Sequence, residues 1–219
     1  MDKSRLLELA EKAMDSALEL SRKETGWNRA CDLGCAEGRL EWRDGEPGDA
    51  KRDVESGQPG LRAWRVHLNL EADVKTVGRI IMDINNMHSW NPALKHSQVL
   101  EKLDSCTMIS YQITDGQPGL VQPRDFLFLS REEIKDKVWM AGGCSVSWPT
   151  HPPTDKYVRA WQYPGIMSAQ QLGKNRTMFC WLLQCDFGGI LPIGILNAVF
   201  PYAIKLFCNA LKNEVRRKK

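Results

Sequence analysis

Near the end of the chain, apolar residues recur at the spacing of an α-helix. They form two neighbouring rows, with Ile195, Val199, Tyr202, Ala203, Leu206 and Ala210 in one and Leu196, Phe200, Phe207 and Leu211 in the other. Pro192 suits the first turn of such a helix, since its missing N–H would be unpaired there, and Gly188-Gly189 breaks the chain before it. The pattern predicts a helix over residues 190–216. A helix that is apolar on most sides must be covered, either as a core helix of a soluble domain or as the lid of an apolar cavity.

A membrane anchor is the third interpretation of this helix. No charged residue occurs from Phe187 to Ile204, which is about the length that a membrane span needs. Two prolines, three glycines and an asparagine fall in this run and make it a weakly hydrophobic span. We therefore expect the helix to belong to a soluble protein.

The remaining pattern predicts two further helices and many strands. Residues 4–23 place apolar side chains on one side of an amphipathic helix, and Asp73 can cap another helix that follows it. Short apolar or alternating runs predict strands over 28–33, 39–43, 61–70, 97–103, 107–113, 125–131, 138–148, 157–163 and 176–187. Gly173-Lys174-Asn175 predicts the turn before the last of them.

This order of elements predicts an α+β fold. Consecutive strands without intervening helices imply an antiparallel sheet, with the helices set apart from it. The stretch 176–187 is apolar on both faces, which predicts a strand in the centre of the sheet. We expect one domain over residues 1–219, in which a helix within residues 1–25 precedes a curved sheet that grips the long C-terminal helix around an apolar cavity.

Composition and charge narrow the function classes. The chain has 42% hydrophobic and 26% charged residues, as is usual for a soluble protein, and its net charge of +3 is too small to predict binding to nucleic acid. The basic residues Arg216–Lys219 end the chain as a solvated tail that could also touch anionic lipid headgroups. The seven cysteines, an odd number, indicate free thiols in a reducing compartment, and residues 1–23 lack the apolar core of a signal peptide. We expect a cytoplasmic location.

No motif in the sequence predicts catalysis, a metal site or a cofactor. The four histidines have no ligand spacing. Gly142-Gly143-Cys144-Ser145 lies in a strand pattern and lacks the nucleophile-elbow sequence. We therefore expect a protein that is not an enzyme.

Several short motifs are spread along the chain, namely Trp90-Asn91-Pro92, Thr107–Tyr111, the run from Leu120 to Phe126 that contains Pro-Arg-Asp-Phe, Tyr157–Ala160, Trp181–Asp186, and Ile190-Leu191-Pro192 with Asn197. Together they resemble the steroidogenic acute regulatory protein-related lipid transfer (START) family. They follow in family order and spacing over nearly the whole chain, and they look closest to the sterol-binding group, which has carotenoid-binding relatives. The resemblance implies a helix-grip fold that encloses one lipid, with the loop 114–123 at the entrance.

The resemblance also implies the site. Its residues would be Asn91, Tyr111, Arg124, Phe126, Phe128, Ser130 and Trp181, with Leu196, Phe200 and Phe207 from the last helix. The sterol-binding group has an acidic residue and a second arginine at two positions counted from the arginine that matches Arg124. In this chain those positions are Tyr111 and Ser130, unless the register has shifted to Gln112 or Arg131. A site with neutral hydroxyls avoids the desolvation cost of buried charges. The residues themselves favour a structural pair of Arg124 and Asp125 that fixes the loop, because long charged side chains are rarely buried unpaired, and contact with the ligand is the other role of Arg124.

These patterns lead to one preferred hypothesis. The chain would be a monomer that exchanges one sterol-like neutral lipid, such as cholesterol, between membranes that it touches transiently from the cytoplasm, with the last helix as the gate. A carotenoid or another neutral lipid is the alternative ligand. The alternative function is a lipid sensor or binder that regulates a partner without transfer.

Overall fold

The computed structural model describes residues 2–32, 38–44, 61–116, 122–189 and 192–218. The helices are α1 (Lys3–Arg22), α2 (Val74–Met82), α3 (Ile84–Met87) and α4 (Ile193–Arg217). The strands are β1 (Asn28–Asp32), β2 (Arg39–Asp44), β3 (Arg62–Leu70), β4 (Leu94–Lys102), β5 (Thr107–Thr114), β6 (Arg124–Lys135), β7 (Val138–Ser145), β8 (Val158–Arg159), β9 (Trp161–Gln162), β10 (Gly165–Gly173) and β11 (Arg176–Asp186). The predicted entrance loop lies partly outside the described residues.

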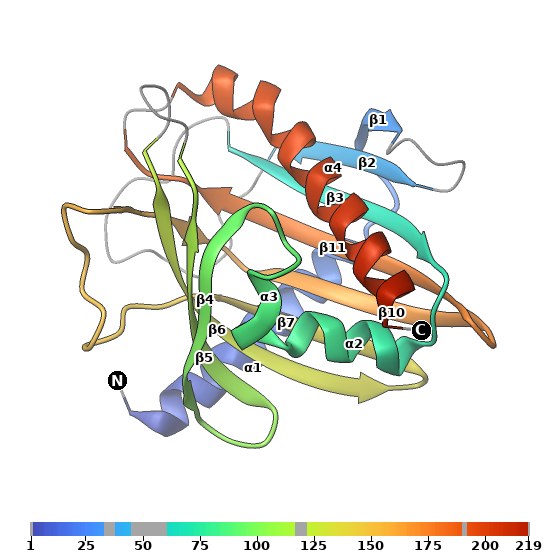
Figure 1. Ribbon diagram of the computed structural model, residues 1–219, viewed down its shortest axis with the longest axis horizontal. Helices are drawn as coiled ribbons and strands as arrows, with labels where there is room; N and C mark the ends of the chain where they lie inside the picture. Colours follow the sequence, from blue (N-terminus) through green and yellow to red (C-terminus); the bar gives the residue numbers. More distant parts are fainter. Residues whose placement is uncertain (1, 33–37, 45–60, 117–121, 190–191, 219) are drawn as a thin grey trace.

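One sheet holds the strands in the order β1-β2-β3-β11-β10-β7-β6-β5-β4, and α4 crosses its face near β3 and β11 (Figure 1). Neighbours along this order are antiparallel, and the short β8 pairs with β6 in parallel. The expected α+β helix-grip class, with β11 inside the sheet, is confirmed. The strand β10 was missed, because its glycines, glutamines and alanine have low strand propensity and its two neighbours hold it in place.

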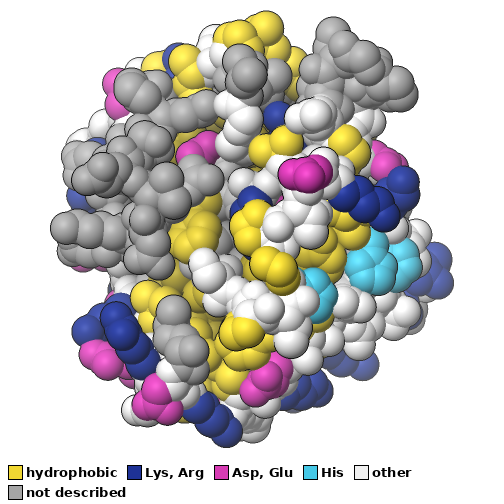
Figure 2. Space-filling view, turned by 90° about the vertical axis from the view of Figure 1, so that its left-hand side faces the viewer, with side chains coloured by type: hydrophobic (Ala, Val, Ile, Leu, Met, Phe, Trp, Pro, Cys, Tyr) yellow, Lys and Arg dark blue, Asp and Glu magenta, His cyan; other side chains and the backbone are white. Residues whose placement is uncertain are grey.

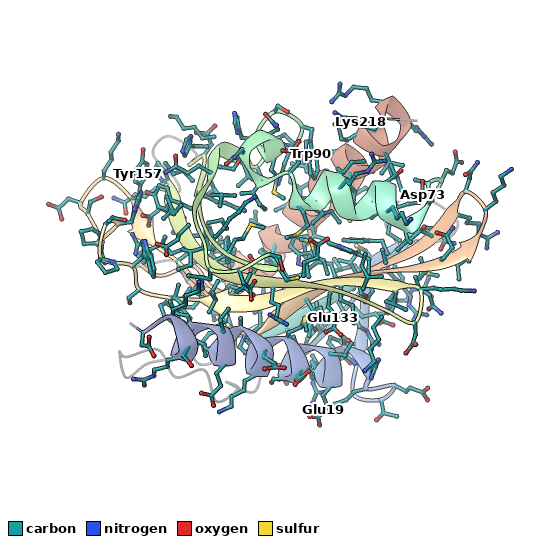
Figure 3. All side chains as sticks on the ribbon, turned by 90° about the horizontal axis from the view of Figure 1, so that it is seen from below. Glu19, Asp73, Trp90, Glu133, Tyr157 and Lys218 are labelled. Carbon is teal, nitrogen blue, oxygen red and sulfur yellow. The ribbon has the colours of Figure 1, made fainter. Side chains whose placement is uncertain are left out.

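The helices lie on both sides of the sheet. Glu19 of α1 is on the opposite side from Asp73, at the start of α2, and Lys218, at the end of α4 (Figure 3). We call the α1 side the outer face and the α4 side the inner face. On β6, Leu127 and Leu129 pack with Leu6 of α1, which fixes the outer face. Because side chains alternate along a strand, Phe126 and Phe128 point to the inner face.

The side chain of Arg65 on β3 fixes the end of α1 against the sheet. Its guanidinium donates hydrogen bonds to the carbonyls of Ser21 (3.0 Å) and Lys23 (2.7 Å). It also forms an ion pair with Glu41 on β2, at 2.7 Å, and lies 4.2 Å from the ring centre of Trp27. The last carbonyls of a helix lack partners within the helix, so Arg65 serves as a cap supplied by another element.

The long helix α4 has two different apolar faces. Ile204, Phe207, Leu211 and Val215 are buried against the sheet and α2, and Leu196 is also buried. The other row is exposed, with Ile195 at 51%, Val199 at 54%, Tyr202 at 64% and Leu206 at 37%. By length and composition alone this helix could cross a membrane. Within its most apolar stretch of 18 residues, 17% is buried in the structure. Its inner row rests on the sheet in this structure, so the outer row is the part that lacks a cover.

Candidate functional site

Aromatic rings fill the space between α4 and one side of the inner face. Phe200 of α4 lies 5.7 Å from Trp64 on β3 and 5.3 Å from Phe187, measured between ring centroids. Phe187 is 6.1 Å from Phe126, which in turn stacks on Phe128 at 5.3 Å. The rings therefore form a continuous series from β6 to β3, passing beneath the start of α4.

A second aromatic group lies further along α4. Phe207 is 4.6 Å from Trp181 on β11 and 5.7 Å from Trp90, which follows α3. Together the two groups include five of the predicted residues, namely Phe126, Phe128, Trp181, Phe200 and Phe207. Leu196 is buried one turn before Phe200. Sequence reasoning missed Trp64, Trp90 and Phe187 as site residues, although the inward alternation of 61–70 already marked Trp64.

Neutral polar side chains face the same interior from β5 and β6. In the register of these strands, Gln112 is opposite Phe126, Ser110 is opposite Phe128, and Met108 is opposite Ser130. Residues opposite each other in an antiparallel pair point to the same face. Ser130 and Gln112 therefore lie on the inner face, where the Gln112 amide is 4.0 Å from the sulfur of Met87.

Tyr111 lies on the other face of the sheet. It is opposite Leu127 and packs with the outer cluster beneath α1. Its hydroxyl donates a hydrogen bond of 2.9 Å to Asp125. Burial raises the pKa of Tyr111, and the bond to Asp125 raises it further. Ser110 and Gln112, on either side of Tyr111, lie on the inner face, because a shift of one residue reverses the face of a strand.

Asp125 is the centre of a buried polar network on the outer face. Arg159 binds both carboxylate oxygens, at 2.9 and 2.8 Å, and also donates to the carbonyl of His151. The ring of His151 lies 4.8 Å from that of Tyr111. Figure 2, which views the molecule from the left-hand side of Figure 1, shows histidine side chains near one another on the surface. The partner of Asp125 is thus Arg159 and not Arg124, and the network ties the segment around His151 to β6.

Arg124 connects the two chain segments that border the start of α4. Its guanidinium donates to the carbonyls of Gln122 and, at 3.4 Å, Phe187. Burial lowers the pKa of Arg124, although an arginine stays charged at neutral pH. Among the described residues its hydrogen bonds go to backbone carbonyls. Arg124 therefore ties Gln122 to Phe187 through their backbone, and contact between Arg124 and a lipid stays a prediction.

The turn before α4 has a defined shape. Gly188 and Gly189 have φ angles of +61° and +71°, which only glycine adopts readily. The carboxylate of Asp186 accepts a hydrogen bond of 2.8 Å from the N–H of Gly188. This turn lies where the sequence predicts a hinge before the helix, and its role as a hinge stays a prediction.

Asn91 is occupied within its own turn. Its side-chain oxygen accepts a hydrogen bond of 3.1 Å from the N–H of Ala93, and the residue is buried. This bond shapes the connection between α3 and β4. This bond is the role of Asn91 that the structure shows, and contact of Asn91 with a lipid stays a prediction.

The comparisons with known proteins agree with this architecture. A sequence model described as the START domain matches residues 11–218. The mitochondrial steroidogenic acute regulatory protein of Danio rerio is 28% identical over 162 residues, which cover 72% of this chain and 57% of that protein. The chain aligns with about half the length of the first curated relatives it matches.

Solved structures show the same fold. Human StAR-related lipid transfer protein 5 superimposes with a TM-score of 0.84 at 18% identity, over 99% of both chains. An aromatase/cyclase from Streptomyces sp. R1128 superimposes with a TM-score of 0.50 at 14% identity, over 72% of this chain and 95% of that one. These identities establish similarity of fold alone.

Proposed function

Because this chain belongs to the START domain family, we propose that it holds one sterol-like neutral lipid between α4 and the inner face and exchanges it between membranes. The observation that carries this proposal is the aromatic series that joins α4 to β3, β6 and β11. Aromatic and aliphatic side chains around a few polar groups are the usual lining of a site for an apolar molecule.

The polar groups near these rings favour a neutral ligand. Gln112 and Ser130 carry no charge, and Arg124 binds backbone carbonyls. Burying a charged headgroup without a partner would cost several kcal/mol. A sterol such as cholesterol fits this chemistry, and a carotenoid is the alternative ligand.

The exposed row of α4 supports contact with a membrane. Ile195, Val199, Tyr202 and Leu206 lie on one side of the helix, and Arg216 and Arg217 are exposed near its end. An apolar stripe can enter the headgroup region, while basic side chains attract anionic lipids. We propose that a monomer rests on the membrane through this row when α4 moves and the lipid passes.

The cysteines support a reducing compartment and argue against cysteine catalysis. Among the described residues, no disulfide is formed by Cys31, Cys106, Cys144, Cys180, Cys185 or Cys208. Burial raises the pKa of the Cys144 and Cys180 thiols to about 11, so they are poor nucleophiles at neutral pH. We propose a cytoplasmic lipid carrier that is not an enzyme. A mitochondrial compartment, as in the name of the fish relative, is the alternative.

Exchange between two vesicle populations tests this function. Donor vesicles carry a fluorescent sterol, acceptor vesicles do not, and the purified full chain is added at catalytic amounts. We expect transfer to accelerate in proportion to protein concentration. Tight binding of the sterol without any acceleration would favour the alternative, a lipid sensor that regulates a partner.

A further inference from the structure

The hydroxyl of Ser110 is buried on the inner face and has no hydrogen-bond partner among the described residues. Ser110 is in the middle of β5 and is 1% exposed, and its Oγ is unpaired. The strand register places it opposite Phe128 on one side and opposite Val99 on the other. The hydroxyl therefore lies on the face that carries the aromatic series.

The other buried hydroxyls in the described chain all have partners. Ser97 bonds to His88, Thr76 to Asp73, Thr107 to Arg131, Ser145 to the N–H of Gln162, and Thr177 to the carbonyl of Ala72. A buried hydroxyl that gives up water without a replacement destabilises the protein. Ser110 is therefore the exception among the buried hydroxyls of the described residues.

The protein itself offers little to satisfy this hydroxyl. The strand β5 is paired on both sides, with β4 and β6, so the nearby backbone groups belong to the sheet ladders. Its same-face neighbours on β5 are Met108, a thioether, and Gln112, whose amide lies beside Met87. A serine hydroxyl can donate one hydrogen bond and accept two, and this capacity is directed at the interior.

We infer that Ser110 binds the oxygen atom of the ligand and selects lipids that carry a hydroxyl or keto group on a rigid apolar body. This inference rests on the proposed function, and it gives the ligand an orientation, with its polar end at β5 and its apolar body along the aromatic rings. The site then discriminates against a hydrocarbon of the same shape, because such a molecule leaves the Ser110 hydroxyl unpaired. A polar site of this kind rejects an analogue that lacks the matching group.

Two pairs of probes test this inference with the full chain. Cholesterol is compared with cholest-5-ene, which lacks the 3-hydroxyl, and zeaxanthin is compared with β-carotene, its hydrocarbon counterpart. Affinities are measured for the wild type, for Ser110→Ala, and for Ser105→Ala as a control. Ser105 lies in the β4–β5 turn, where its hydroxyl is 3.5 Å from the Cys106 sulfur.

In the wild type we expect the hydroxylated member of a pair to bind about 2- to 10-fold more tightly, the worth of one neutral hydrogen bond. Ser110→Ala should remove this preference by weakening only the hydroxylated probe, and Ser105→Ala should keep it. The lipid-free Ser110→Ala protein should melt at the same temperature or higher, because the variant removes an unpaired hydroxyl.

Two other outcomes would contradict the role of Ser110 or the proposed function. If Ser110→Ala keeps the wild-type preference, or if the wild type has none, Ser110 does not bind the ligand oxygen and the inference is wrong. If the wild type binds no member of either pair, the proposed function itself fails, and the role of Ser110 fails with it.

Discussion

The ring of Trp181, on the central strand β11, lies 4.6 Å from the ring of Phe207 on α4. This contact joins the proposed gate to the middle of the sheet, and Trp64 and Phe200 form a second contact nearer the start of the helix. A lipid held between the two elements must separate these rings or replace one of them. We therefore expect the energy of opening α4 to control both binding and release.

Hydrogen exchange should detect this opening directly. The strand β11 is paired with β3 and β10, whereas one row of α4 faces solvent. Amide groups in regions with few buried contacts open more easily. We expect the amides of α4 to exchange faster than those of β11, and faster still when vesicles are present. Equal protection of the two elements under both conditions would mean that the lipid leaves by another route.

Pro201 should make α4 easier to open. A proline inside a helix removes one backbone hydrogen bond and destabilises the helix by about 3 kcal/mol, and Pro201 lies within α4. Pro201→Ala should raise the melting temperature and slow lipid exchange between vesicles. Pro192→Ala is the matched control, because Pro192 precedes the first turn, where proline is tolerated. An exchange rate that rises in Pro201→Ala would contradict gating by this helix.

A crosslink supplies the complementary test of the gate. A disulfide between α4 and the segment 114–123 should stop lipid exchange when oxidised and restore it when reduced. Mass spectrometry verifies the oxidation state, and the two single-cysteine variants serve as controls. Full exchange by the verified oxidised protein would remove α4 from the exit path.

Tyr111→Phe should separate stability from binding. The variant removes a hydrogen bond to the buried Asp125 carboxylate, so the free energy of unfolding should fall by about 1.5 to 3 kcal/mol. Sterol affinity should stay the same, because Tyr111 lies on the outer face. Ser110→Ala, on the inner face, should weaken binding of a hydroxylated lipid by about 0.5 to 1.5 kcal/mol. Weaker binding by a Tyr111→Phe protein of unchanged stability would return Tyr111 to the site.

The sequence predicted those features of the structure that depend on the local pattern of apolar and polar residues. The places of β3 and β11 were predicted correctly, from the alternation of Trp64, Val66 and Leu68 and from the apolar residues on both faces of β11. Both predictions were possible because the burial of a strand face determines which positions of the sequence are apolar. The face of Tyr111 depended on strand register across a loop, and register is a tertiary property. The two rows of α4 are similarly apolar, so only packing could show that the Leu196 row is buried and the Ile195 row exposed.

His67 should make stability depend on pH. Burial, with Arg39 and Arg65 nearby, lowers the pKa of His67 from 6.5 to about 4, although Glu41 acts in the opposite direction. Between these two values the unfolded chain binds the proton and the folded one does not, so folding stability falls as pH drops from 6.5 towards 4. The full cost is up to about 3 kcal/mol. In urea denaturation at pH 7 and pH 5, His67→Gln should show a smaller loss of stability than the wild type, and an equal loss would contradict this role.

Native mass spectrometry of the protein purified without detergent tests the central claim most directly. If one neutral lipid is held between α4 and the sheet, the spectrum should contain a complex of one chain with one ligand, and extraction should yield a sterol or another oxygenated apolar lipid. Adding cholesterol or zeaxanthin should fill the remaining empty fraction, and phosphatidylserine should not displace it. A complex that contains only anionic phospholipid, or phosphatidylserine that binds as tightly as cholesterol and zeaxanthin, would contradict the account.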